Sequence, residues 1–168
     1  EAGYELVGNR FVKRASSGER VASSSKPLTT RHSPLADVPP LAEVWLPLYE
    51  AKMIHQFDHR FGTYEGLDSR PQNAPIPTPS PEDHTDPAFV IQPWYWVPQS
   101  DVRSRLKEWS RNWLLGFRRV ARTTDERTGI YSLIPWVGAG DSVFLIIVQN
   151  GNSALCAALL ASLTSTVF

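Results

Sequence analysis

Residues 113–135 read WLLGFRRVARTTDERTGIYSLIP, and this stretch decides how the second half of the chain folds. Leu114–Ala121 alternates loosely between apolar and polar residues, which predicts a strand. Gly129–Pro135 is rich in β-branched and aromatic residues and predicts a second strand. We therefore expect two strands here, with arginines and threonines at and between their ends.

The same stretch concentrates positive charge. From Arg103 to Arg127 there are seven Arg and one Lys against three acids, on a chain of formal net charge +0. Arg carries a planar fork that matches phosphate oxygens and base edges, and Thr hydroxyls can bond phosphates. The alternative is a solvated surface of Arg–Glu pairs. The residues predicted to contact nucleic acid are Arg118, Arg119, Arg122, Thr123, Thr124, Arg127 and Thr128.

Composition bounds the class of protein. A chain of 168 residues is long enough for one ordinary domain with a core. Neutral net charge argues against a protein that coats nucleic acid indiscriminately, but it allows a local basic patch. Cys156 is the single cysteine, which excludes a disulfide framework and a cysteine metal cluster. We expect a reducing cytoplasm.

Neither end of the chain predicts a membrane segment. The first twelve residues lack a basic segment followed by an apolar one, as a secretory signal would have. Residues 142–168 are apolar, but the polar run 149–152 leaves pieces too short to span a bilayer. The chain begins without Met and stops within an apolar pattern. We expect part of a larger protein.

The N-terminal half divides into a poorly defined region and the start of the main body. Residues 1–43 hold a predicted strand–turn–strand at Tyr4–Arg14, followed by a Ser- and Arg-rich loop. The main body is expected at 44–168. Leu41–Phe57 is strongly apolar and contains Pro47, and its pattern fits either a short helix or an irregular strand.

A Pro-rich acidic stretch at 65–88 is expected to be a stiff, extended connector rather than a folded element. Phe89–Pro98 then predicts an aromatic edge strand, because its prolines cannot donate to a ladder. A helix is expected over Val102–Trp113 with Ser100 or Asp101 as its N-cap, one face apolar and one basic. The predicted fold class is α/β, a mixed sheet with a few helices and a long Pro-rich loop.

The last third of the chain adds two apolar elements. Val143–Val148 is an unbroken apolar run and predicts a fully buried strand, after a turn at Gly138–Asp141. Ser153–Phe168 predicts a helix.

Two constellations could carry chemistry. His55 and His59 have the i, i+4 spacing of a zinc peptidase helix, but Gln56 stands where the catalytic Glu is needed. Asp37, Glu50 and Lys52 have the outline of a Mg²⁺-dependent nuclease site. The alternative for this set is a surface Lys beside a Glu.

Three stretches carry a family resemblance: Pro47–Tyr64 (PLYEAKMIHQFDHRFGTY), Pro93–Pro98 (PWYWVP) and Trp113–Pro135. In this order they resemble the C-terminal target-recognition region of restriction–modification adenine-N6 DNA methyltransferases, of the type IIG group and similar single-chain phage-defence methylases. The resemblance covers most of 44–168. It departs at Ala51, where the family pattern has glycine. The resemblance leads us to expect a glycine-rich segment after Phe168, where the given sequence stops.

The resemblance implies DNA reading rather than methyl transfer. It implies a target-recognition-like fold, double-stranded DNA as the partner, and a prokaryotic cytoplasm. It places S-adenosylmethionine and catalysis in an upstream methyltransferase domain of the same parent chain, with no cofactor, metal or catalytic residue in this part. A nuclease module and a structural scaffold remain the alternatives. The second predicted DNA-contact strip consists of Lys52, His55, His59 and Arg60.

Overall fold

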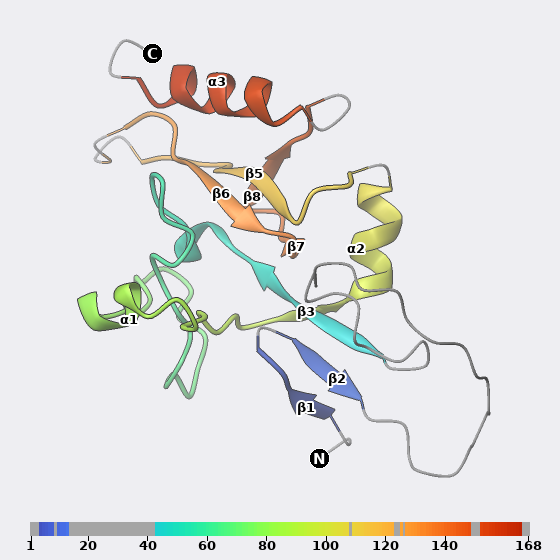
Figure 1. Cartoon of the computed structure of the whole chain (residues 1–168). Coiled ribbons are helices and arrows are strands. Elements are labelled where there is room, and N and C mark those ends of the chain that lie inside the picture. The colour runs from blue at the N-terminus through green and yellow to red at the C-terminus, as the bar shows by residue number, and fades with distance from the viewer. Residues whose placement is uncertain are drawn as a thin grey trace, which may run out of the picture.

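The computed structural model describes residues 4–8, 10–13, 43–107, 109–122, 125, 127–148 and 152–165. Two sheets form the body, so the chain is mixed α/β with mainly antiparallel strands and few helices (Figure 1). The first sheet has the order β1-β2-β3-β4, and β7 also pairs with β3; the second has the order β6-β5-β8. The strands are β1 Tyr4–Leu6, β2 Phe11–Lys13, β3 Val44–Tyr49, β4 Trp96–Pro98, β5 Trp113–Arg118, β6 Tyr131–Pro135, β7 Gly138–Ala139 and β8 Val143–Ile146.

The strand–turn–strand at the N-terminus is confirmed. β1 and β2 pair antiparallel, and Gly8 between them has a φ of 58°, which favours glycine. β2 continues onto β3. The Ser- and Arg-rich loop that follows β2 lies outside the described residues.

The two strands of the Arg/Thr stretch are also confirmed. β5 and β6 pair antiparallel over five residue pairs, from Trp113 opposite Pro135 to Phe117 opposite Tyr131. β5 ends at Arg118, three residues before the predicted end at Ala121. Its other edge pairs with β8, so β5 is the central strand of this sheet.

The segment 41–57, which could have been helix or strand, contains both. β3 runs through Pro47 and is followed by the one-turn 3₁₀ helix η1, Ala51–Met53. Its partner β4 is an edge strand, as predicted, but it covers only Trp96–Pro98 of the predicted Phe89–Pro98. β7 pairs parallel with β3, although a turn was expected there, and a Cβ on Gly138 would lie 2.5 Å from Val97 Cγ1. Glycine permits this close approach.

The helix predicted at Val102–Trp113 is wrong at both ends. Helix α2 covers Gln99–Leu106, and its N-cap is Pro98 rather than Ser100 or Asp101. Lys107 has a φ of 20°, which leaves the helical region and turns the chain toward β5. The helical spacing continues in the sequence beyond the point where the backbone turns. The pattern therefore placed the C-terminal end of the helix too late in the chain.

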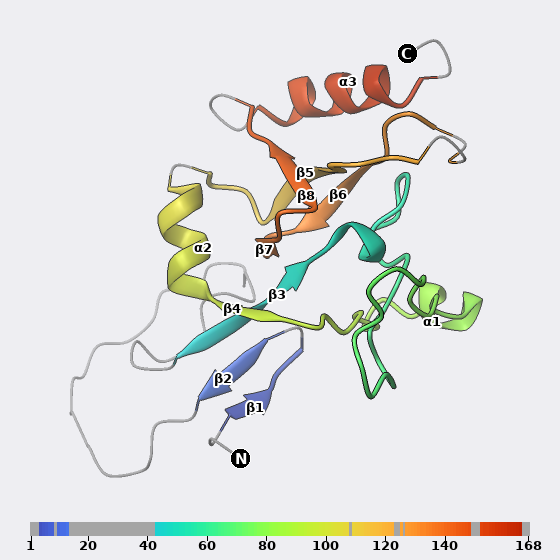
Figure 2. The same ribbon diagram turned by 180° about the vertical axis from the view of Figure 1, so that it is seen from behind.

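The Pro-rich stretch 65–88 packs against the rest of the molecule and contains a short helix, which corrects the prediction of a stiff, extended connector without a folded element. Ile76 is 8% exposed and belongs to the main core. Helix α1, Pro81–Thr85, is capped by Ser80, whose hydroxyl accepts from the Asp83 N–H at 3.1 Å. The figures show this stretch looping beside η1 (Figures 1 and 2).

The C-terminal elements are more exposed than predicted. Phe144 and Ile147 are 47% and 51% exposed, so the expectation that Val143–Val148 is fully buried is wrong. Helix α3, Ser153–Leu163, begins at Asn152, whose side chain accepts from the Leu155 N–H. α3 lies across the three-stranded sheet and buries Cys156 (Figure 2).

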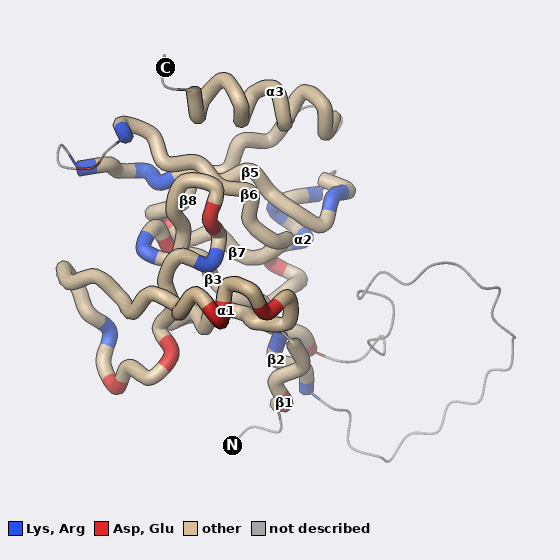
Figure 3. The backbone as a smooth tube through the Cα atoms, turned by 60° about the vertical axis from the view of Figure 1, so that its left-hand side comes forward, with Lys and Arg blue, Asp and Glu red and all other residues tan. Residues whose placement is uncertain are grey.

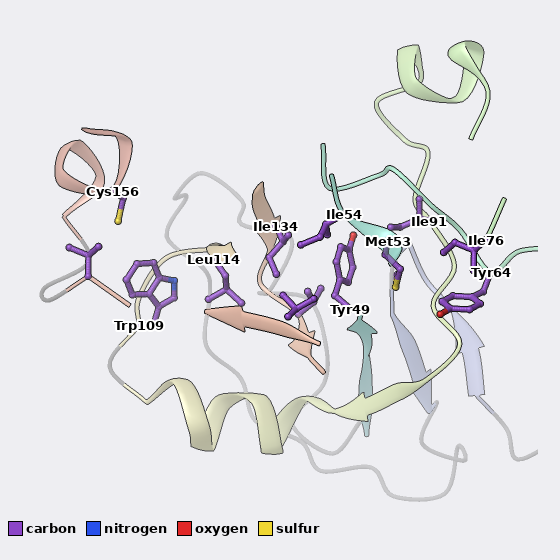
Figure 4. Close-up of a cluster of buried hydrophobic side chains, with 13 residues drawn as sticks. Tyr49, Met53, Ile54, Tyr64, Ile76, Ile91, Trp109, Leu114, Ile134 and Cys156 are labelled. Atoms are coloured by element: carbon purple, nitrogen blue, oxygen red, sulfur yellow. The ribbon is translucent and has the colours of Figure 1, made fainter. Parts of the chain in front are cut away.

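Among the described residues, the larger of two hydrophobic clusters joins the two sheets, and a smaller one packs β3 against α2. The larger cluster includes Tyr49 from β3, Met53 from η1, Leu114 from β5 and Ile134 from β6, each at most 1% exposed (Figure 4). Burying such side chains stabilises the fold by about 1.5–3 kcal/mol each.

Within the described residues, no helix is long and apolar enough to cross a membrane.

Candidate nucleic-acid interface

Arg118 stands at the end of β5, and its guanidinium is bonded inside the protein. Nε and one terminal nitrogen donate to the Ile54 carbonyl oxygen at 2.9 and 2.7 Å. Its cation also lies 5.6 Å from the centre of the Phe61 ring. Burial lowers the pKa of this guanidinium. The fold therefore uses Arg118 to tie β5 to the segment after η1.

Arg127 has a similar internal partner. Its guanidinium donates to the Thr164 carbonyl oxygen at 2.9 Å, where α3 ends. A cation at this position satisfies a terminal carbonyl and opposes the negative end of the helix dipole. Arg127 thus ties the segment before β6 to α3.

Arg119 and Arg122 are the two arginines of the stretch whose side chains remain at the surface. The Arg119 side chain is 51% exposed, and its ion pair with Asp141 is long at 3.4 Å and open to water. The backbone N–H of Arg122 donates to Asp125, while its side chain is exposed. Thr128 is also exposed. Thr123 and Thr124 lie outside the described residues.

The second predicted strip is occupied largely by internal contacts. Lys52 Nζ donates to three carbonyl oxygens of the Pro-rich loop, those of Pro71, Gln72 and Ala74, at 2.8, 3.1 and 2.7 Å. Desolvation is the main cause that lowers the pKa of Lys52. Arg60 fixes the far end of the same loop.

The guanidinium of Arg60 donates to the carbonyls of His84, Asp86 and Phe89. His55 stacks on Phe61 with ring centres 4.6 Å apart. His59 is half-buried, and desolvation lowers its pKa. Of this strip, Lys52 and Arg60 hold the loop, while His55 stacks on Phe61 and His59 is half-buried.

The described residues of the alternative nuclease site make internal contacts with other parts of the protein. The Glu50 carboxylate accepts from the Tyr64 hydroxyl and from Arg70, the latter at 2.6 Å. Lys52 is committed to the loop carbonyls, and Asp37 lies outside the described residues. Among the described residues no group of three or more His, Cys, Asp or Glu could hold a metal ion.

The turn at His55–Asp58 explains why the histidines do not share a helix face. His55 and Asp58 exchange two backbone hydrogen bonds, and Phe57 between them has a φ of 61°. A bulky residue adopts this conformation only under constraint. Here the Phe57 N–H donates to the Tyr131 carbonyl at 3.0 Å, and Gln56 accepts from the Tyr131 N–H. The turn therefore docks on β6.

Sequence reasoning predicted a basic helix face after β4 but gave it no role, and in the structure it forms a second cationic surface. Arg103, Lys107 and Arg111 line a cavity of about 500 Å³ where α2 leads into β5. The basic spacing on the helix was visible in the sequence, but the cavity was not, because it forms only after the helix ends at Leu106. Figure 3 shows Lys and Arg gathered at α2 and at the β5–β6 loop, on opposite sides of the three-stranded sheet.

Comparison with known proteins assigns this chain to no family. No family model, curated protein or solved structure matches this chain.

Proposed function

We propose that this chain binds duplex DNA as the target-recognition part of a site-specific adenine-N6 DNA methyltransferase of a restriction–modification or phage-defence system. The sequence resemblance is what supports the assignment to this class of methyltransferase. S-adenosylmethionine and the catalytic residues would belong to another part of the parent protein. The proposed partners are double-stranded DNA and that methyltransferase domain.

The observation that carries DNA contact is the exposure of Arg119 and Arg122 just beyond β5. Arg118 holds the end of the strand by its two bonds to Ile54, and the exposed Arg119 and Arg122 follow this fixed point in the chain. The ion pair of Arg119 with Asp141 is weak enough to yield to a phosphate, because exposed pairs contribute only about 0–1 kcal/mol. Arg118 and Arg127 then act as positioning residues.

Salt-dependent binding tests the DNA contact. We expect the chain to bind a labelled duplex more weakly as salt rises, because phosphate contacts release counterions. Arg119→Ala and Arg122→Ala should each reduce the slope of log affinity against log salt by about one if each contacts a phosphate. Lys13→Ala is the matched control, since Lys13 is an exposed cation on the first sheet. A wild-type chain without salt-dependent duplex binding would overturn the proposal.

Sequence selection tests the methyltransferase class separately. A target-recognition part should enrich one short adenine-containing site from a random duplex library, because base-edge contacts specify sequence. If either arginine is bidentate to guanine, its loss should cost about 1–3 kcal/mol and relax the preference at one base. Salt-dependent binding without any enrichment would leave DNA contact standing and remove the target-recognition role.

A further inference from the structure

The cavity at the α2–β5 junction combines cations with neutral hydrogen-bonding groups. Arg103 comes from the last turn of α2, Lys107 follows that helix, and Ser110 and Asn112 come from the segment leading to β5. Arg111 lines the same cavity. No carboxylate occurs among these lining residues, within the part of the chain that the structure describes. Such a set of donors suits an anion with several oxygens.

The same cavity also has apolar lining residues. Leu106, Trp109 and Trp136 line it. The Trp109 N–H donates to the Leu106 carbonyl at 2.7 Å, and the indole N–H of Trp109 donates to the Trp113 carbonyl. The Trp136 N–H donates to the Asn112 carbonyl at 3.0 Å. These side chains offer nonpolar surface in the same cavity as the cations.

Arg103 and Lys107 differ from the cations that hold the fold together. Arg118, Lys52 and Arg60 donate to backbone carbonyls, so their heads already have partners. The side chains of Arg103 and Lys107 form no hydrogen bond or ion pair with any residue that the structure describes. Their charges therefore remain available to an external anion.

We propose that this cavity binds one nucleotide unit, with its phosphate between Arg103 and Lys107 and its sugar or base against Leu106 and Trp136. This rests on the proposed function, which it deepens by naming a second point of contact. A volume of about 500 Å³ lies within the usual range for small-molecule sites. The phosphate could belong to a DNA strand or to a free mononucleotide.

A competing role for these cations is stabilisation of the helix end. Positive charge near a helix C-terminus opposes the helix dipole. Arg105 separates the two roles, because it is an exposed cation of the same last turn that lines a different cavity, between α2 and β7. Its removal changes the helix charge equally and leaves the proposed site intact.

Binding measurements with defined probes test the site. Intrinsic tryptophan fluorescence of the whole chain is titrated with dAMP, inorganic phosphate, a single-stranded oligonucleotide and a duplex. We expect dAMP or a strand to quench the signal, and Arg103→Ala to weaken binding about tenfold, the change for one lost charge-assisted hydrogen bond. Arg105→Ala should remain within about twofold of wild type, as for an exposed charge. Trp136→Phe should remove most of the quenching.

Lys107→Gly keeps the inference testable if an alanine variant folds poorly. Glycine suits the positive φ of this position, so the fold should tolerate it while the charge is lost. We expect its dAMP affinity to fall as for Arg103→Ala. Unchanged far-ultraviolet circular dichroism shows that the helix persists.

The outcomes separate this site from DNA binding in general. Duplex binding that depends on Arg119 and Arg122, with no response to any nucleotide probe and no effect of Arg103→Ala, overturns the cavity site alone. Nucleotide binding lost in Arg103→Ala, without duplex binding, supports the site and overturns the DNA function. Equal binding of inorganic phosphate and dAMP, or an equal loss in Arg105→Ala, overturns the nucleotide assignment. Competition between a strand and dAMP identifies the strand as a source of the unit.

Discussion

At the scale of single residues, the cations of this chain divide by what their charged groups contact. A guanidinium that satisfies a buried carbonyl is part of the fold, because an unpaired carbonyl would cost about 1–3 kcal/mol. A guanidinium at the surface can instead serve a ligand. Arg118 and Arg119 are neighbours in sequence and fall into different groups, since the first bonds Ile54 and the second has a long, exposed ion pair.

Replacing these two arginines should therefore affect stability differently. Arg118→Met should lower the free energy of unfolding by about 1–3 kcal/mol, because the Ile54 carbonyl loses two donors. Arg119→Met, the control with the same change of side chain, should stay within about 0.5 kcal/mol. Urea denaturation followed by circular dichroism measures both. Equal losses in the two variants would contradict this division.

Two histidines near the Pro-rich loop should give opposite pH dependence. Bonds to the Ser80 carbonyl and to Asp58 raise the pKa of His84 above 6.5, with the Ser80 contact the larger cause. Its stabilisation is thus complete below that pH and lost as pH rises through the folded pKa. Desolvation lowers the pKa of His59, so protonation below 6.5 opposes folding.

The matched variants are His84→Gln and His59→Gln, each compared with wild type by thermal unfolding. The His84→Gln deficit should be larger below about pH 6 than above about pH 8. His59→Gln should gain relative to wild type as the pH falls over the same interval. Deficits that do not change with pH would show that neither imidazole titrates differently in the folded state.

At the scale of elements, the local sequence pattern predicted which segments form strands better than it predicted where the elements end. The β1–β2 pair and the β5–β6 hairpin follow from alternation and turn residues within a few positions. The end of α2 does not, because Lys107 leaves the helix where the chain must turn toward β5. The folded conformation of the Pro-rich loop could not be predicted from its local sequence either, since it depends on hydrogen-bond donors from distant parts of the sequence.

Lys52 is the main such donor for the first half of that loop. Lys52→Met keeps most of the aliphatic stem but leaves the carbonyls of Pro71, Gln72 and Ala74 without their shared partner. We expect faster amide exchange and faster proteolytic cleavage around residues 66–76, with little change in β5. Arg60→Met is the positional control and should loosen 84–89 instead. Protection unchanged by either substitution would show that the loop is held by its apolar contacts.

The candidate site shows the same limit of sequence reasoning. Charge and spacing selected Arg118–Thr128 and the strip from Lys52 to Arg60, yet side chains of one charge type have different partners in the fold. Whether a cation binds a carbonyl or remains at the surface depends on which segments pack beside it. That information lies in long-range contacts, which the local pattern does not carry.

At the scale of the whole molecule, the two sheets share the larger of the two hydrophobic clusters. Tyr49 and Met53 approach it from the first sheet and η1, while Leu114 and Ile134 approach from the second (Figure 4). A shared core couples the stability of the two cationic surfaces, because both the β5–β6 loop and the α2–β5 segment are anchored to β5. Loss of packing at β5 should therefore affect both together.

Leu114→Ala tests that coupling, since Leu114 is 0% exposed on the central strand. Removal of its side chain should lower the free energy of unfolding by about 2–5 kcal/mol, from lost burial and the cavity left behind. Because the larger cluster serves both sheets, tryptophan fluorescence and circular dichroism should report a single, coincident transition in wild type and variant. Leu133→Ala is the matched control on β6, where the side chain is 44% exposed and should contribute little. Two separated transitions in the Leu114 variant would show that the sheets unfold independently, and the two cationic surfaces would then have to be treated as separate binding elements.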